Sequence, residues 1–143
     1  MRNNYLLITL LILVLTGACG DSSGMLTVRE TWSRPAVAGE NGAAYFVIEN
    51  GTTADDTLLS VNSEIASATE VHMSMSDDNG VMSMAMQESV SVPAGEEVEF
   101  KPGGFHVMFV ALKQDLSVGD TLTLTLNFQN AGELTVQVPV KEP

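Results

Sequence analysis

The sequence predicts an all-β fold, and three observations support this prediction. Apolar and polar residues alternate with a period of two in several short segments. Turn-forming residues separate these segments, and no segment keeps the spacing of an amphipathic helix. Alternation with this period is typical of strands that bury one face and expose the other. We therefore expect a β-sandwich or β-barrel that forms one domain.

The expected strands follow one another along the chain with short connections. In order, they cover residues 26–32, 43–49, 58–61, 68–73, 81–86, 88–92, 98–100, 105–112, 121–128 and 134–140. Glycine, proline, asparagine and aspartate between these segments favour tight turns. Such turns are expected at Asn50-Gly51, Asp77–Gly80, Pro93–Gly95, Lys101–Gly104 and Asn130–Glu133.

The alternation in these segments also predicts the core. Residues 121–128 place leucines and a phenylalanine on one face and threonines on the other, and residues 134–140 repeat this pattern after a turn, as in a hairpin. In 105–112 the aromatic and valine positions share one face. The predicted core comprises Trp32, Tyr45, Val47, Leu58, Val92, Phe100, Phe105, Val107, Phe109, Leu122, Leu124, Leu126, Val136 and Val138.

The first residues have the layout of an export signal. Arg2 precedes an apolar run that is too short for a good membrane span, and small residues lead to Cys19. The segment Thr16-Gly17-Ala18-Cys19 resembles a bacterial lipobox, although Thr16 stands where leucine is usual. We predict a signal peptide over 1–18 that is cleaved before a lipidated Cys19, a linker over 19–25 and a domain over 26–143. An uncleaved anchor helix and ordinary cleavage without a lipid are the alternatives.

The net charge of −12 makes binding to nucleic acid unfavourable, because an acidic surface repels the phosphate backbone. The same surface gives no electrostatic attraction to anionic lipids, so membrane contact is expected only through the lipid anchor. It would attract cations and basic partners, and the alternative interpretation is that it only keeps an exported domain soluble.

Cys19 is the single cysteine, and it lies outside the predicted domain. An intramolecular disulfide, cysteine catalysis and a blue-copper site with its cysteine ligand are therefore excluded. No nucleophile and base stand at an interpretable spacing, so we do not expect an enzyme.

Soft metal ligands gather in one window of the chain. Both histidines, His72 and His106, lie there together with six methionines: Met73, Met75, Met82, Met84, Met86 and Met108. His106 and Met108 share one face of their predicted strand, opposite its core residues. Met82, Met84 and Met86 share a face of another strand.

Thioether and imidazole ligands together favour Cu(I). Thioether sulfur is soft and neutral, whereas zinc prefers thiolate, imidazole or carboxylate, and calcium and magnesium prefer oxygen. Thioethers also cannot be lost to disulfide formation in an oxidising compartment. Each methionine taken alone could instead fill a core or form an adaptable surface, so the argument depends on the joint pattern.

The spacing of these residues resembles the H-M-x10-M-x21-H-x-M signature of PCuAC-type periplasmic copper(I) chaperones. The signature falls on His72, Met73, Met84, His106 and Met108. Further segments resemble the family: Trp32-Ser33-Arg34-Pro35, Ala43-Ala44-Tyr45-Phe46, residues 101–108 and Val118-Gly119-Asp120. The resemblance covers about residues 26–140.

The resemblance implies a cupredoxin-like Greek-key β-barrel or sandwich that binds one Cu(I). By the family pattern the ligands are His72, Met84, His106 and Met108. Relatives of this kind pass copper to the dinuclear centre of cytochrome c oxidase, alongside Sco-type proteins, so an exported location in the periplasm or cell envelope is expected. Met73 is assigned to packing or to a supporting position behind the ligands because it faces away from His72. Met75, Met82 and Met86 are additional thioethers that could offer alternative ligands, a docking surface or a route for copper entry. Copper storage or tolerance, and a metal-free binding module, are the alternative functions.

Overall fold

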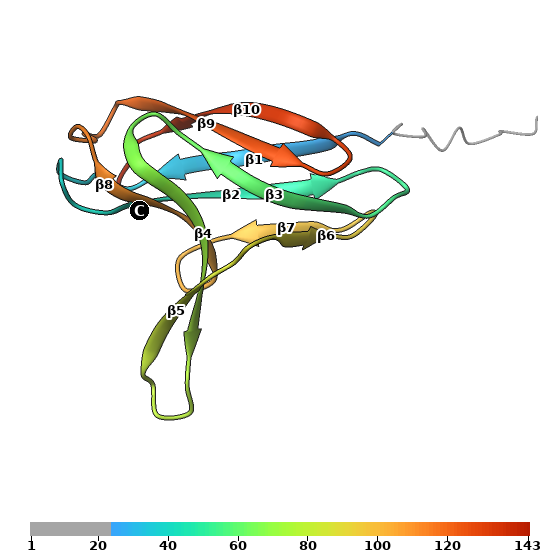
Figure 1. Ribbon diagram of the computed structural model, residues 1–143, viewed down its shortest axis with the longest axis horizontal. Helices are drawn as coiled ribbons and strands as arrows, with labels where there is room; N and C mark the ends of the chain where they lie inside the picture. The colour runs from blue at the N-terminus through green and yellow to red at the C-terminus, as the bar shows by residue number, and fades with distance from the viewer. Residues whose placement is uncertain (1–23) are drawn as a thin grey trace, which may run out of the picture.

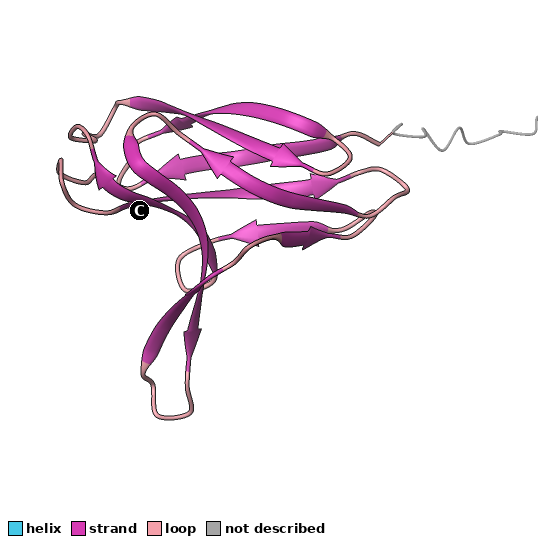
Figure 2. Ribbon diagram, viewed as in Figure 1, coloured by secondary structure: helices cyan, strands magenta, loops and turns pink. Residues whose placement is uncertain are grey.

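The computed structural model describes residues 24–143, and this part of the chain consists of strands and connecting loops (Figures 1 and 2). The predicted signal peptide, Cys19 and residues 20–23 of the linker lie outside the described residues. The strands are β1 (Leu26–Ser33), β2 (Gly42–Asn50), β3 (Asp56–Asn62), β4 (Ala66–Ser76), β5 (Met82–Met86), β6 (Val90–Val92), β7 (Glu97–Phe100), β8 (Phe105–Leu112), β9 (Thr121–Phe128) and β10 (Gly132–Pro139). Over residues 24–143 there is no helix with the length and apolar character needed to cross a membrane.

The strands form two sheets that pack as a sandwich, which confirms the predicted all-β, cupredoxin-like class. The larger sheet has the order β1-β2-β7-β8-β4-β5, and the smaller has the order β10-β9-β3-β6. Each predicted segment overlaps one of these strands. The largest difference is β4, which was expected over 68–73 and runs from Ala66 to Ser76, because its last residues continue in a hairpin with β5.

The core lies between the two sheets and follows the predicted alternation in β8 and β9. Val107 and Phe109 of β8 and Leu124 and Leu126 of β9 are fully buried in it. Burying apolar side chains of this size contributes about 1.5–3 kcal/mol each, so this layer provides the main stabilisation of the fold.

The core prediction was wrong for Trp32, which is only partly buried, whereas Tyr45 and Val47 are buried as predicted. These three residues lie outside the inter-sheet cluster, whereas Phe46 and Ile48 belong to it. The strand that holds them, β2, is flanked by β1 on one side and by β7 and β8 on the other, and it is buried on both faces along most of its length. A strand buried on both faces reads as a continuous apolar run, so its sequence does not show which side faces the core.

The β4–β5 hairpin projects away from the body of the sandwich (Figure 1). Its strands pair from His72 opposite Met86 to Ser76 opposite Met82, and the turn at Asp77–Gly80 closes it. The carboxylate of Asp77 accepts hydrogen bonds from the backbone N–H groups of Asn79 and Val81, at 2.9 and 2.8 Å. The arm is therefore a defined element with exposed faces.

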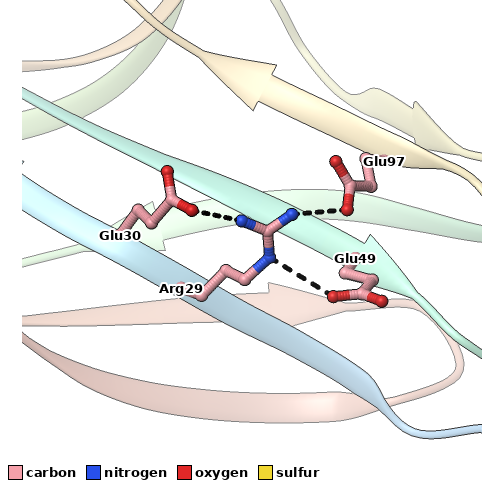
Figure 3. Close-up of polar contacts among 4 residues, drawn as sticks. All are labelled: Arg29, Glu30, Glu49 and Glu97. Atoms are coloured by element: carbon pink, nitrogen blue, oxygen red, sulfur yellow. Dashed lines mark hydrogen bonds and ion pairs between the residues drawn. The ribbon is translucent and has the colours of Figure 1, made fainter.

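Arg29 ties together three strands of the large sheet on its outer surface (Figure 3). Its guanidinium contacts Glu30 of β1, Glu49 of β2 and Glu97 of β7. The register of β1 against β2 shifts between Arg29 and Trp32, where Glu30 adopts a φ of 56°. Exposed ion pairs of this kind contribute little stability, so we regard this cluster as a marker of the bulge and not as a binding site.

Asp56 is a buried carboxylate that connects two parts of the small sheet through hydrogen bonds. Its carboxylate accepts hydrogen bonds from the backbone N–H groups of Thr57 (2.7 Å), Asn130 (2.9 Å) and Ala131 (2.8 Å), which joins β3 to the β9–β10 turn. Burial raises the pKa of Asp56, but the backbone hydrogen bonds outweigh this effect and hold the pKa below its usual value. The charged form is therefore the one that stabilises the fold.

We predict that Asp56→Asn destabilises the domain at pH 7 by about 1–3 kcal/mol, because an amide cannot accept all of these hydrogen bonds. The depressed pKa means that wild-type Asp56 contributes its stability above the normal aspartate pKa and loses it as pH falls through the folded value. The difference between the two proteins should therefore shrink on acidification. Urea unfolding at pH 7 and at about pH 3, near the pKa range of aspartate, measures this. Asp78→Asn, at the exposed hairpin turn, serves as the control, and equal destabilisation by both variants would contradict the prediction.

Candidate metal centre

The pairing of β4 with β8 places the two histidines opposite each other. In this antiparallel ladder His72 pairs with His106, Val71 with Val107, and Glu70 with Met108. Directly opposite residues point to the same face of a sheet. Because Val71 and Val107 are buried against the core, both histidines lie on the outer face of the large sheet.

The two imidazole rings are close enough to share one ion. Their centroids are 5.8 Å apart, and their planes are inclined by 36°. Metal–imidazole bonds of about 2.0 Å place each ring centroid about 3 Å from a bound ion, so two coordinated rings can be at most about 6 Å apart. The observed separation fits this limit.

A hydrogen bond holds His72 in the tautomer whose Nδ1 lone pair is available to a metal ion. Its Nε2 lies 2.8 Å from a carboxylate oxygen of Glu70, two residues earlier on the same strand face. The carboxylate accepts a hydrogen bond from the N–H of Nε2, so in the neutral ring the lone pair lies on Nδ1. Nδ1 is buried and has no hydrogen-bond partner among the described residues. A buried polar atom without a partner is unfavourable, and a bound cation would satisfy it.

His106 has the complementary arrangement. It is only 6% exposed, and its Nδ1 lies 3.2 Å from the backbone carbonyl of Gly104, to which it donates. This leaves the lone pair on Nε2. The Lys101–Gly104 turn sets the geometry, with Gly103 at a φ of 82° that favours glycine and a hydrogen bond from the Gly104 N–H to the Lys101 carbonyl.

Met84, His106 and Met108 line one surface hollow with a volume of about 400 Å³. Met108 is two residues from His106 on β8, and Met84 reaches the hollow from β5, where it pairs with Ser74 of β4. Met84 is 60% exposed, so most of its thioether side chain lies in solvent. The hollow therefore combines one imidazole and the thioethers of two predicted ligands at an accessible surface.

Aromatic and basic side chains stand beside these ligands. The hollow is also lined by Tyr45 and Arg34, whose guanidinium carbon lies 5.5 Å from the Tyr45 ring centroid. Trp32 packs on Tyr45 with ring centroids 4.6 Å apart, and burial raises the pKa of Tyr45. The packing of Trp32 and Arg34 on Tyr45 explains why β2 is also apolar on the face opposite the core.

The family model described as “Putative lipoprotein LpqE-like” matches residues 26–140, which includes the whole sandwich. The chain belongs to this family. A protein of Leifsonia xyli subsp. xyli that is named as a lipoprotein is 26% identical over 123 residues, covering 86% of this chain and 74% of the relative. An uncharacterised protein of Rickettsia prowazekii is 29% identical over 116 residues, covering 78% of this chain but only 64% of that protein.

Solved PCuAC domains share the fold of this LpqE-like protein, which confirms the resemblance inferred from the sequence. A copper-bound PCuAC domain from PmoF2 is 25% identical, with a TM-score of 0.69 over 85% of this chain and 97% of that domain. An apo PCuAC domain from PmoF1 is 27% identical, with a TM-score of 0.68 over 82% and 94%. DR1885 from Deinococcus radiodurans, solved with Cu(I), is 24% identical with a TM-score of 0.62, over 85% of this chain and 83% of that one, and supports the fold alone.

The structure places all four predicted ligands on neighbouring strands and on one sheet face. His72 lies on β4, Met84 on β5, and His106 and Met108 on β8, and these strands are adjacent in the order β8-β4-β5. His72 does not line the hollow itself but lies opposite His106. Met73 pairs with Phe105 on the other face, as expected for a packing residue.

Glu70 is a residue of the site that the sequence pattern did not indicate, whereas the pattern already places Met82 on one strand face with Met84. Glu70 contacts His72, and Met82 lines the same hollow as Met84. Both stand two positions before a predicted ligand, so strand alternation could have identified Glu70 as well as the methionine row. Glu70 differs from the predicted ligands in being a hard oxygen donor, so the pattern of soft ligands does not include it.

Proposed function

We propose that this LpqE-like protein is a copper chaperone that binds one Cu(I) through His72, Met84, His106 and Met108. The observation that carries the proposal is the directly paired His72 and His106, with both rings oriented by hydrogen bonds and with thioethers on the same face. Copper is the cargo in this scheme. The copper-bound PCuAC domain with the same fold supports the choice of metal.

The ligand chemistry suits Cu(I). Two neutral imidazole nitrogens and two neutral thioethers form a soft set without a carboxylate or thiolate, which favours a soft monovalent cation over zinc or calcium. Glu70 then supports a ligand without binding the metal itself. A carboxylate that accepts a hydrogen bond from the second ring nitrogen of a histidine ligand fixes the ring orientation and raises the basicity of the ligating nitrogen. Metal binding needs no proton release from the methionines.

Release follows from the exposure of Met84. A thioether at the surface can leave the ion without disturbing the core, so a partner ligand can take its position. An acceptor with thiolates binds Cu(I) more strongly, and the ion then passes by successive ligand replacement with no change of oxidation state. We propose the dinuclear copper centre of cytochrome c oxidase as the final acceptor, together with Sco-type proteins.

We further propose that the protein is exported and anchored by a lipid on Cys19. Membership of a lipoprotein family and the lipobox-like segment before Cys19 support this location. A lipid anchor would keep the sandwich beside membrane-bound acceptors. Since one acyl chain gives only marginal binding, stable anchoring requires the multiple chains of a lipoprotein.

The proposed ligand set predicts that the domain binds one equivalent of Cu(I), and that Met84→Ala and His106→Ala each lower the affinity more than about tenfold. Removing groups that only support ligands already costs this much. A chelator competition under reducing conditions measures the affinity, and circular dichroism checks that the variants stay folded. Met75→Ala, on the opposite face of the hairpin, is the matched control. Unchanged affinity in the Met84 and His106 variants would refute the ligand set.

The contact between Glu70 and His72 predicts that Glu70→Gln lowers the Cu(I) affinity by about 10–100-fold while the stoichiometry stays at one. The amide can present its NH₂ group to Nε2, which removes the bias that leaves the lone pair on Nδ1. Glu64→Gln, on the exposed β3–β4 loop, makes the same change in charge away from the site. If both variants lose the same affinity, overall charge and not ring orientation is responsible.

The delivery role predicts that a deletion strain loses cytochrome c oxidase activity under copper limitation and regains it with added copper. Complementation with the wild-type gene should restore activity, and the double variant Met84→Ala/His106→Ala should not. Cys19→Ser should move the protein from the membrane to the soluble fraction. Normal oxidase activity combined with lost copper tolerance would instead identify a storage protein.

A further inference from the structure

A third methionine of β5 lines the same hollow as the proposed ligands. Met82 borders the cavity together with Met84, His106 and Met108. Met82 and Met84 stand two positions apart on β5, so they share a face, and their partners on β4 are Ser76 and Ser74. The hollow thus contains three thioethers, one more than the signature of the family assigns.

Packing does not explain the position of Met82. Its side chain is 59% exposed, close to the value for Met84, and it is the first residue of β5, paired with Ser76 at the turn end of the hairpin. A single exposed apolar side chain is ordinary on a protein surface. Here, however, the exposed thioether borders the same cavity as a buried imidazole that has its Nε2 lone pair free.

We propose that Met82 is a further Cu(I) ligand, which forms an outer position of the site together with Met84. This proposal rests on the proposed function and adds the route by which the ion arrives and leaves. Cu(I) is first held by the thioethers of Met82 and Met84, and it then moves inward as His106 replaces the Met82 sulfur and as Met108 and His72 complete the site. All of these ligands are neutral, and copper remains Cu(I) throughout.

The other methionines of the hairpin do not occupy this position. Met75 pairs with Ser83 on the opposite face of the arm, and it is 51% exposed. Met86 pairs with His72 but borders a different hollow, which Glu70 and Val71 also line. Met75 is therefore a matched control for Met82, with the same side chain, a similar exposure and the same hairpin.

Nuclear magnetic resonance of ¹³C-methyl-methionine protein tests the proposal directly. The methyl signals are assigned with single methionine-to-leucine variants, and the protein is titrated with Cu(I) under reducing conditions. We expect the signals of Met84, Met108 and Met82 to shift, while the Met75 signal stays in place. If Met84 and Met108 shift and Met82 moves no more than Met75, the outer position is wrong and the proposed function stands. If none of the methionine signals moves, the copper function itself fails.

The rate of copper uptake provides a second test. Stopped-flow transfer of Cu(I) from a chelator should be several-fold slower in Met82→Leu than in the wild type, with an affinity that falls much less than in Met84→Ala. Met75→Leu should transfer copper at the wild-type rate. Leucine keeps the apolar bulk and removes only the sulfur, so equal rates in all three proteins would overturn the proposal.

Discussion

The antiparallel register between β4 and β8 is the constraint on which the site depends. Val71 and Val107 form a directly opposed pair on the core face, and the pair that follows on the outer face is His72 with His106. A slip of one residue would turn every side chain of one strand to the other face. It would place an imidazole in the inter-sheet core and a valine at the position proposed for the metal. Apolar burial therefore fixes the register, and the register brings together two histidines that are 34 positions apart in sequence numbering.

The local backbone then determines which nitrogen of each ring is available. Strand alternation brings Glu70 to the same face as His72, and the Lys101–Gly104 turn directs the Gly104 carbonyl at His106. One ring therefore keeps its lone pair on Nδ1 and the other on Nε2. Both rings are set before any ion arrives, so binding does not have to pay the full entropic cost of ordering them.

The sequence predicted the strands well, because alternation and turn residues are local signals. It also predicted the outer face of β8, where Phe105, Val107 and Phe109 contrast with His106 and Met108. It did not show which face of β2 points between the sheets, because Tyr45 and Val47 are as apolar and nearly as buried as Phe46 and Ile48 beside them. That strand is covered on both faces, and only tertiary packing shows that Trp32 and Arg34 lie over Tyr45. The proximity of β5 to β8 likewise depends on the sheet order β8-β4-β5, which no local pattern contains.

The hairpin places two of the proposed methionine ligands on a different part of the fold from the two histidines. The histidines stand on strands that are anchored in the sandwich, whereas Met82 and Met84 stand on β5, an edge strand that pairs only with β4 in its sheet. An edge strand on a projecting arm has few buried contacts, and such elements open at low free-energy cost. The histidines that we propose as ligands are thus paired with each other within the sheet, whereas two of the proposed methionine ligands lie on its edge strand. Because thioethers are neutral, their departure leaves no uncompensated charge behind, and the arm can give up the ion without a large electrostatic penalty.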